Sequence, residues 1–364
     1  MGAGALSAAP DAAAVPRVAV DALGADDGAA VVVEGALRAS RGREVVVSLV
    51  GPERTLREEI ARAQAGGAAL EVIDAPEAVG MAEKLSVATL KKRSSIQVAL
   101  ERVRDGQADA FFSAGNTAAC WTIARRVLGT LEDVDRPALA AVVPNHDGRT
   151  VVIDVGANAE CKARHLEEFA IMANAYARGV LGITRPRVGL MSVGEEQSKG
   201  NELVREAHEV LKRSSLHFVG NVEGHDLFTG KVDVVVMDGF TGNVVLKASE
   251  TAAELVFELI RAGLPRGLRG ALLLPFLKPA FEAVKRRSDP AEIGGAPLLG
   301  LRGCCVIGHG KSSARAIEAG IRTAAFFYKS GVNAAIESDL RTLGRAAEAP
   351  TSPEAASPPV GAGA

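Results

Sequence analysis

Aromatic side chains are scarce in this chain, and an excess of positive charge is missing. Only 4% of its 364 residues are Phe, Trp or Tyr, and 42 Lys and Arg stand against 44 Asp and Glu, for a formal net charge of −2. Proteins that bind nucleic acid usually carry a basic surface, and those that bind single strands add aromatic platforms on which bases stack. The composition therefore gives no indication of nucleic-acid binding.

Long apolar runs are missing as well. No stretch of the sequence approaches the roughly 18 consecutive apolar residues that a membrane-spanning helix needs. Residues 1–16 contain no Lys or Arg and no long apolar run, so they lack the pattern of a secretory signal peptide. These residues and residues 345–364 are rich in Ala, Gly, Pro and Ser, which predicts two disordered tails.

Cysteine is scarce, and its spacing excludes the common cysteine frameworks. The four cysteines form no C-x-x-C pair, and Cys304 and Cys305 are adjacent within an apolar run. Such a pattern indicates neither a zinc site nor a disulfide scaffold. We expect buried free thiols, which suit a reducing cytoplasm.

What the chain does contain is a steady alternation of short apolar runs and amphipathic helical segments. The β-branched run Val151–Ile153 is typical of a strand buried on both faces, and a helical pattern follows from about residue 165 to 181. This alternation predicts an α/β fold with a doubly wound, mostly parallel sheet. We expect one catalytic domain over residues 17–344, with a helical hairpin protruding at about residues 244–290. No internal repeat is evident, and the Gly- and Pro-rich stretch 289–300 is predicted to be a loop.

Six of the predicted strands end in the same kind of loop, in which Gly accompanies Asn, Asp, His or Lys. The loops are Gly115–Thr117, Asp154–Lys162, Gly194–Asn201, Gly220–Gly224, Asp238–Asn243 and Gly308–Ser313. If the sheet is parallel, all six loops lie along one edge of it. Free backbone amides, helix N-termini and cations at that edge would suit a phosphate group.

The sequence lacks the familiar nucleotide and hydrolase motifs. There is no G-x-G-x-x-G between a strand and a helix, no G-x-S-x-G and no H-E-x-x-H. Gly310-Lys311-Ser312 resembles the end of a Walker A loop, but Cys305 stands where its first Gly belongs. Ser113 has no His or Asp partner that the sequence can place, so a nucleophilic serine is not favoured. A dehydrogenase is disfavoured because neither a dinucleotide loop nor a metal-binding set of acids is visible.

Nine ordered segments between about Val18 and Ala325 resemble the bacterial phosphate acyltransferase (PlsX) family. They are VDALGADD (20–27), SAGNTAA (113–119), DRPALAAVVP (135–144), DVGANAECK (154–162), VGEEQSKGNEL (193–203), GNVEGHD (220–226), DGFTGNVVLK (238–247), GGAPLLG (294–300) and GHGKSSARA (308–316). In the first segment Leu23, Ala25 and Asp27 replace the Met, Gly and His usual in that family, so its part in phosphate binding is in question.

The resemblance implies an enzyme of phospholipid synthesis. Members of that family form acyl-phosphate from acyl-acyl-carrier-protein and inorganic phosphate, and a membrane glycerol-3-phosphate acyltransferase accepts the product. The resemblance also implies a fold like that of phosphate acetyltransferases and isopropylmalate dehydrogenases. It further implies a homodimer and a cytoplasmic location with peripheral attachment to an anionic membrane surface. No cofactor and no metal site are expected.

Acyl transfer to phosphate requires a bound phosphate, donors for the developing oxyanion and a proton for the leaving thiolate. We predict His309, Lys162 and Asn158 as catalytic residues, with His309 as the general acid or oxyanion donor. The residues predicted to bind phosphate are Gly115, Asn116, Thr117, Asp154, Lys199, Asn201, Asp238, Asn243 and Ser312. The alternative for the lysines is a purely structural ion pair with Glu160, Glu195 or Glu196.

Two other functions remain open at this stage. One is a phosphate acetyltransferase-like activity on coenzyme A thioesters, and the other is a module that binds acyl chains or lipids without turnover. An acidic acyl carrier protein would need a basic docking surface, for which the sequence offers two clusters. These are Lys91, Lys92 and Arg93, and Lys285, Arg286 and Arg287. The alternative for each is an ordinary solvated surface run.

The stretch Gly263–Phe281 generates the first testable prediction. It combines Leu and Phe with Pro, Arg and Lys and is too short to span a bilayer, so we predict an apolar tip that dips into an anionic membrane surface. Replacing Leu272, Leu273 and Phe276 by Ser is then expected to abolish co-sedimentation with anionic vesicles, with turnover in solution and assembly mass unchanged. A triple variant that becomes monomeric or unfolds would instead show that the stretch is a dimer interface or part of the core.

Overall fold

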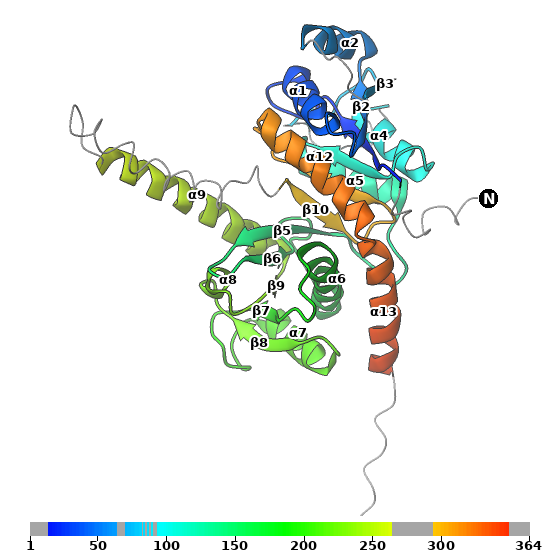
Figure 1. Cartoon of the computed structure of the whole chain (residues 1–364). Helices are drawn as coiled ribbons and strands as arrows, with labels where there is room; N and C mark the ends of the chain where they lie inside the picture. The colour runs from blue at the N-terminus through cyan, green and yellow to red at the C-terminus, as the bar shows by residue number, and fades with distance from the viewer. Residues whose placement is uncertain are drawn as a thin grey trace, which may run out of the picture.

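The computed structural model describes residues 14–63, 70–81, 83, 86, 89, 93–263 and 294–348, with side chains as far as residue 342. Within these residues eleven strands form one continuous sheet in the order β3-β2-β1-β4-β11-β10-β5-β6-β9-β7-β8. Most neighbouring strands are parallel, so the predicted α/β class with a mostly parallel sheet is confirmed (Figure 1).

The elements follow one another along the chain with few long connections. The strands are β1 (Arg17–Asp21), β2 (Val46–Gly51), β3 (Leu70–Asp74), β4 (Ala110–Ser113), β5 (Ala138–Pro144), β6 (Arg149–Ile153), β7 (Val188–Met191), β8 (Phe218–Val222), β9 (Val234–Val236), β10 (Ala296–Leu299) and β11 (Cys304–Ile307). The helices are α1 (Ala29–Ser40), α2 (Glu53–Arg62), α4 (Ser95–Arg104), α5 (Thr117–Leu128), α6 (Ala163–Leu181), α7 (Glu202–Arg213), α8 (Asp226–Thr229), α9 (Gly239–Gly263), α12 (Ala314–Lys329) and α13 (Val332–Glu348).

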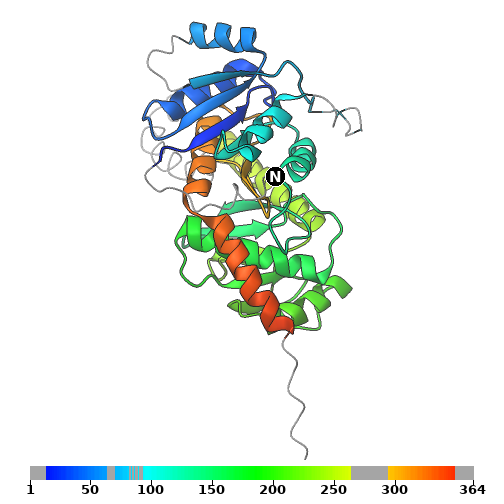
Figure 2. The same cartoon turned by 90° about the vertical axis from the view of Figure 1, so that its right-hand side faces the viewer.

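Helices cover both faces of the sheet because its central strands are buried on both sides. Successive residues of β1 divide between two cores, with Val18 and Val20 in one and Ala19 in the other. The first core receives α1, α12, α6, α7 and α13, and the second receives α4, α5 and the first turns of α9. Figure 1 shows α9 projecting away from the body, and Figure 2 shows α13, in red, lying across the green part of the chain.

The sheet reverses direction at its centre. Strand β10 is antiparallel to both β11 and β5, and β5 is antiparallel to β6. Strands β6, β9, β7 and β8 therefore run opposite to β1, β2, β4 and β11. Read outward from the β10–β5 contact, five strands on one side correspond in order and relative direction to the five on the other, and β3 has no counterpart, so the topology of the two halves has an approximate two-fold relation. The corresponding strands are β10, β11, β4, β1 and β2, and β5, β6, β9, β7 and β8.

Matching ion pairs confirm the relation between the halves. In the first half Arg17 donates its backbone N–H and Nε–H to Asp109 Oδ2 and its Nη2 to Asp109 Oδ1 and Gly106 O, at 2.7–3.2 Å. In the second half Arg187 makes the same four bonds to Asp233 and Gly230, at 2.7–2.9 Å. Each pair ties the start of a strand to the loop before its parallel neighbour, and we call each one an Arg–Asp clasp.

Several expectations from sequence are corrected. The six Gly-containing loops do not share one edge, because the strands they follow run in two directions. The repeat that the sequence hides exists in the structure, and the predicted loop 289–300 contains β10, in which Pro297 lies opposite Val306. Helix α13 continues to Glu348, four residues into the segment predicted to be disordered. The second arm of the predicted hairpin lies outside the described residues.

The cysteines behave as expected from their spacing. All four are free, and Cys120, Cys304 and Cys305 are buried while Cys161 is partly buried. Burial raises the pKa of the Cys120 and Cys304 thiols to about 12, so these thiols stay protonated. None of the helices in the described ranges is both long and apolar enough to cross a bilayer.

The clasps yield a stability prediction. Asp233→Ala leaves the Arg187 guanidinium and backbone donor without their acceptor, so we expect the free energy of unfolding to fall by about 2–3 kcal/mol in urea titrations at pH 7. Glu132→Ala, which removes an exposed partner of Arg341, serves as control and is expected to change it by less than about 0.5 kcal/mol. Equal losses in the two variants would contradict a special role for the clasp.

The same variants should also differ in their pH dependence. Burial alone would raise the pKa of Asp233, but hydrogen bonds and charge from Arg187 outweigh it and hold that pKa below its usual value. A group with a depressed folded-state pKa stabilises the protein above its unfolded pKa and loses that contribution as the pH falls through the folded value. The difference in the free energy of unfolding between wild type and Asp233→Ala is therefore expected to be full at pH 7 and to shrink below about pH 4.

Candidate functional site

The loop after β6 is held by one buried carboxylate. Asp154 Oδ1 accepts hydrogen bonds from the backbone N–H groups of Leu139, Gly156 and Ala157, at 3.0–3.2 Å. Its Oδ2 accepts from the backbone N and the side-chain Nδ2 of Asn158, at 2.7 and 2.9 Å. Burial raises the pKa of Asp154, and these donors oppose the rise. Since all five partners are donors, the ionised carboxylate satisfies them, and Asp154 organises the loop rather than moving a proton.

Helix α9 begins directly against this loop. A Cβ added to Gly242 would stand 1.9 Å from the carbonyl oxygen of Asp154, and one added to Gly239 would stand 2.7 Å from that of Asn158. Asp238 accepts from the backbone N–H and the hydroxyl of Thr241, at 2.9 and 2.7 Å, and so caps the helix. We call the loop Asp154–Lys162, together with Asp238 and Asn243, the β6–β9 cluster.

Lys162 is the last residue of the loop after β6, and its side chain is exposed. It is the residue before the first turn of α6, and its backbone N–H donates to His165 Nδ1 at 3.0 Å. Asn158 is buried, and its Nδ2 also donates to Pro137 O at 3.0 Å. Asn158 therefore holds the loop together, whereas the ammonium of Lys162 is available to an anion.

A second group of predicted residues lies after β4 and β11. Ser113 is buried and donates to Asp21 Oδ2 at 2.7 Å, while its Oγ accepts from the N–H of Gly115 at 3.0 Å. Burial raises the pKa of Asp21, and the hydroxyl of Ser113 opposes the rise. The amide of Gly115, predicted to bind phosphate, is thus already engaged inside the protein.

Asn116 is engaged on both sides of its amide. Its Oδ1 accepts from Ala119 N at 3.0 Å as the N-cap of α5, and its Nδ2 donates to Met81 O at 2.9 Å. Thr117, the first residue of α5, is exposed. Of these three predicted phosphate ligands, Thr117 at the helix N-terminus is the one whose side chain faces solvent.

His309 is exposed on the loop after β11. Its Nδ1 accepts from the backbone N–H of Lys311 at 3.2 Å, which places the proton of the neutral ring on Nε2. Two backbone hydrogen bonds hold this loop. Gly308 N donates to Ser113 O of β4 at 2.8 Å, and Ser312 N donates to His309 O within the loop at 2.9 Å. An exposed Nε2–H on a braced loop can donate to an oxyanion or a leaving group. Ser113, Asn116, Thr117, His309 and Ser312 form what we call the β4–β11 cluster.

The loop after β7 contributes Lys199 and Asn201, both exposed. Asn201 Oδ1 accepts from Val204 N at 2.9 Å as the N-cap of α7. The loop is anchored by Asn221, whose Nδ2 donates to Glu196 O at 2.9 Å and whose Oδ1 contacts His208 Nδ1 at 2.9 Å. Strands β6, β9 and β7 run in one direction, so this loop and the β6–β9 cluster lie at the same edge of the sheet.

The structure therefore divides the predicted site residues between the two edges of the sheet. The β4–β11 cluster lies at one edge, and the β6–β9 cluster with Lys199 and Asn201 lies at the other. Sequence reasoning missed the residues that support these loops, namely Asp21, Asp135, Arg136 and His165. Asp21 is the last residue of β1, and Asp135 is the first residue of the segment 135–144 that resembles the family. Both positions could therefore be noticed in the sequence, but their partners lie 92 and 30 residues away along the chain.

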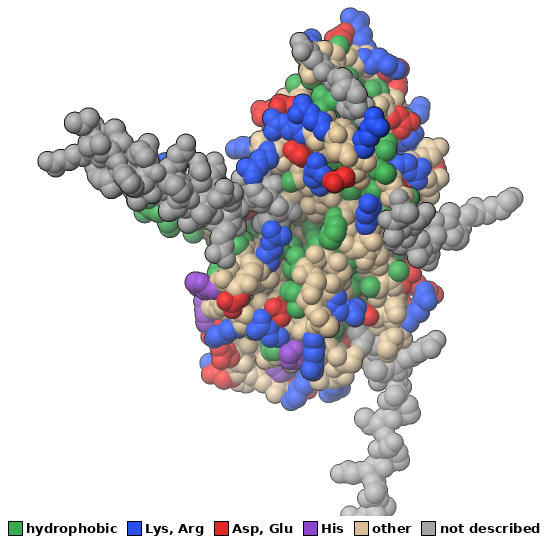
Figure 3. All heavy atoms as spheres, in the orientation of Figure 1, with side chains coloured by type: hydrophobic (Ala, Val, Ile, Leu, Met, Phe, Trp, Pro, Cys, Tyr) green, Lys and Arg blue, Asp and Glu red, His purple; other side chains and the backbone are tan. Residues whose placement is uncertain are grey.

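The predicted partner and membrane residues lie mostly outside the described residues. Lys91, Lys92, Lys285, Arg286 and Arg287 are outside them, as are Leu272, Leu273 and Phe276. Arg93 is described and exposed, and its backbone N–H donates to Glu77 Oε2 at 2.7 Å. Figure 3 shows Lys and Arg side chains interspersed with Asp and Glu over the part of the first half where α1 and α12 lie.

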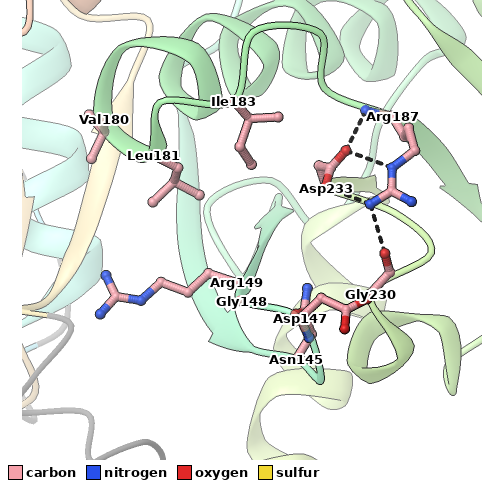
Figure 4. Close-up of a pocket in the computed structure, with 10 residues that line it drawn as sticks. All are labelled: Asn145, Asp147, Gly148, Arg149, Val180, Leu181, Ile183, Arg187, Gly230 and Asp233. Carbon is pink, nitrogen blue, oxygen red and sulfur yellow. Dashed lines mark hydrogen bonds and ion pairs between the residues drawn. The ribbon is translucent and has the colours of Figure 1, made fainter.

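A pocket of about 530 Å³ lies elsewhere, at the amino ends of β6, β7 and β9 (Figure 4). Its lining includes Arg149, Leu181, Ile183 and the clasp residues Arg187 and Asp233. None of the predicted site residues lines it. The carboxyl ends of parallel strands, not their amino ends, are the usual place for a ligand, so we do not assign the reaction to this pocket.

Comparison with known proteins identifies the family. Residues 16–335 match the model of a family described as "Fatty acid synthesis protein". A phosphate acyltransferase from Acidobacterium capsulatum is 48% identical over 325 residues, which cover 89% of this chain and 96% of the relative. One from Aquifex aeolicus is 41% identical over 328 residues, covering 90% and 97%.

Solved structures of lower identity show the same fold. A phosphotransacetylase from Streptococcus pyogenes matches with a TM-score of 0.58 at 18% identity, over 85% of this chain and 93% of that one. A phosphotransacetylase from Staphylococcus aureus matches with a TM-score of 0.56 at 14% identity, over 87% and 94%. The sequence matches cover nearly the whole of both chains at more than 40% identity, and on that ground the protein belongs to the phosphate acyltransferase family of enzymes.

Proposed function

We propose that the protein transfers an acyl group from acyl-acyl-carrier-protein to inorganic phosphate and releases acyl-phosphate for phospholipid synthesis. The observation that carries the proposal is the exposed ammonium of Lys162 at the N-terminus of α6, on a loop whose backbone is held by Asp154. A cation and the free amides of a helix N-terminus together form a site for an anion such as phosphate. The loop is ordered by protein groups alone, so phosphate would not have to organise it.

The reaction needs no covalent enzyme intermediate. An oxygen of hydrogen phosphate attacks the thioester carbonyl, the C–O bond forms and the C–S bond breaks. The proton carried by hydrogen phosphate ends on the thiolate, so atoms and charge balance. In this proposal Lys162 and the α6 N-terminus hold phosphate, with Asp238, Asn243, Lys199 and Asn201 at the same edge. Within one chain His309 lies at the other edge of the sheet, so in this proposal its Nε2–H donates a hydrogen bond to the oxyanion or thiolate from the second copy of the chain in the proposed homodimer.

His309 allows a direct test of this mechanism. His309→Ala is expected to lower the turnover of palmitoyl-acyl-carrier-protein with labelled phosphate by about two to four orders of magnitude, because the hydrogen-bond donor to the oxyanion or thiolate is lost. Since His309 is exposed, the melting temperature should not change. A folded variant that loses less than tenfold removes His309 from the mechanism.

The same assay separates the alternative functions. Acyl-phosphate formed from the carrier-protein thioester supports the proposal. Turnover only with acetyl-coenzyme A would instead indicate a phosphate acetyltransferase-like enzyme. Saturable binding of the thioester without product would indicate a binding module.

The acyl carrier protein, an acidic partner, would approach on a basic surface. Lys311 and Arg315 are exposed and follow His309 along the chain, Arg315 in the first turn of α12, which begins at Ala314. Docking there would bring the thioester to the imidazole. The clusters Lys91–Arg93 and Lys285–Arg287 remain proposed contributors.

We further propose a homodimer that contacts the membrane peripherally, so that the product can pass to a membrane glycerol-3-phosphate acyltransferase. Only Gly239 and Gly242 of the 25 residues of α9 are buried, whereas Val244, Leu255, Val256 and Leu259 are more than half exposed. The two-fold relation explains why: α5 is the counterpart of α9 and packs against α4, but the counterpart of α4 is α8, a helix of four residues. A second copy of this chain would cover the apolar side of α9.

The dimer is tested at the exposed end of the helix. Leu255→Asp with Leu259→Asp is expected to convert a dimer into a monomer in light-scattering measurements, because each buried Leu would contribute roughly 1.5–3 kcal/mol. Glu250→Gln on the same helix is the matched control and should leave the mass unchanged. A wild-type protein that is already monomeric, or a double variant that stays dimeric, would contradict this arrangement.

A further inference from the structure

A short segment before β5, residues 135–137, contacts both the loop after β6 and helix α6. Asp135 N donates to Glu168 Oε2 at 3.0 Å, and Arg136 Nη1 donates to Glu160 O at 2.9 Å. Pro137 O accepts from Asn158 Nδ2 at 3.0 Å. Arg136 and Pro137 thus hold the loop from outside and Asp135 holds α6, while Asp154 holds the loop from inside.

The fourth contact reaches Lys162 itself. The buried imidazole of His165 accepts the Lys162 N–H at Nδ1, at 3.0 Å, and its Nε2 lies 2.9 Å from Asp135 Oδ2. Because Nδ1 is the acceptor, the ring proton is on Nε2 and is donated to the carboxylate. Asp135 also pairs with Arg164, the second residue of α6. The imidazole therefore joins a carboxylate on one segment to the backbone of the proposed phosphate-binding lysine on another.

Electrostatics favour the state that this geometry needs. Burial lowers the pKa of His165, and the carboxylate of Asp135 opposes this. Hydrogen bonds from Arg164 and His165 lower the pKa of Asp135 to about 2. At neutral pH the imidazole is accordingly neutral, which keeps Nδ1 free to accept, and Asp135 is ionised.

We infer that Asp135 and His165 are positioning residues for phosphate, which set the backbone of Lys162 and the start of α6 before substrate binds. This rests on the proposed function, in which Lys162 binds phosphate. A group positioned in advance loses little freedom on binding, whereas a displacement of about 1 Å can cost about a hundredfold in rate. The two residues touch neither phosphate nor the thioester in this proposal, and they act through Lys162.

Four variants test the inference. Asp135→Ala removes the acceptor of the His165 proton, and Asp135→Asn keeps an oxygen there without the charge. His165→Asn places an oxygen near the position of Nδ1 and can still accept the Lys162 N–H, whereas His165→Ala cannot. Asp339→Asn is the control, since Asp339 pairs with Arg178 at the other end of α6.

We expect Asp135→Ala and His165→Ala to raise the KM for phosphate about tenfold, with the KM for the acyl thioester within twofold of wild type. Asp135→Asn and His165→Asn should recover part of the loss. Hydrogen exchange at the Lys162 amide should accelerate in both Ala variants and stay unchanged in Asp339→Asn. These readouts separate positioning from a general loss of stability, which would raise both KM values or lower the melting temperature in all variants.

Two results would overturn the inference. One is an unchanged KM for phosphate in folded Asp135→Ala and His165→Ala, and the other is slow Lys162 exchange in both. A separate variant, Lys162→Gln, tests the underlying proposal. If it leaves the KM for phosphate unchanged, the proposed role of Lys162 fails whatever the four variants show. If it raises that KM while the Ala variants do not, only the positioning inference fails.

Discussion

The antiparallel contact between β10 and β5 is the constraint on which the rest of the structure depends. It joins two halves of one sheet whose parallel strands run in opposite directions, and it is the centre of their approximate two-fold relation. Because ligand-binding loops follow the carboxyl ends of parallel strands, reversing the strands also separates the loops into two groups. The β4–β11 cluster, with His309, and the β6–β9 cluster, with Lys162, are the direct result. The equivalent Arg–Asp clasps show that each half is closed at its other end in the same way.

Buried carboxylates organise both clusters, and they do so by accepting hydrogen bonds. Asp154 gathers five N–H donors around one turn, and Asp21 receives the hydroxyl of Ser113, which in turn receives the amide of Gly115. A buried charge is costly unless donors surround it, so these loops cannot easily adopt another arrangement. The exposed groups, Lys162, Thr117 and His309, stand on this framework. In the proposed reaction the framework holds the reacting groups in place, and the exposed groups contact the substrates.

The two halves differ where the proposed partners would bind. In the first half α4 covers α5, but in the second half the four-residue α8 leaves α9 projecting from the body (Figure 1). That difference leaves an apolar surface along α9, and exposed apolar surface of this kind usually marks an interface. The proposed dimer follows from the shortening of one helix. The exposed cations Lys311 and Arg315, in contrast, belong to the half that carries His309.

Sequence by itself determined the class of fold, the family and most of the strands, because these depend on local patterns and on ordered motifs. The runs at β1, β4 and β6 and the helix α6 are apparent from β-branched content and helical periodicity. Only the tertiary structure decided that the parallel strands of the two halves run in opposite directions, since strand order and direction depend on which strands pair across the whole chain. It also decided that Pro297 lies in a central strand and that Asp135 meets His165, 30 residues away. The repeat stayed hidden because the two halves share backbone geometry and one ion pair but few side chains, and backbone geometry is visible only once the chain has folded.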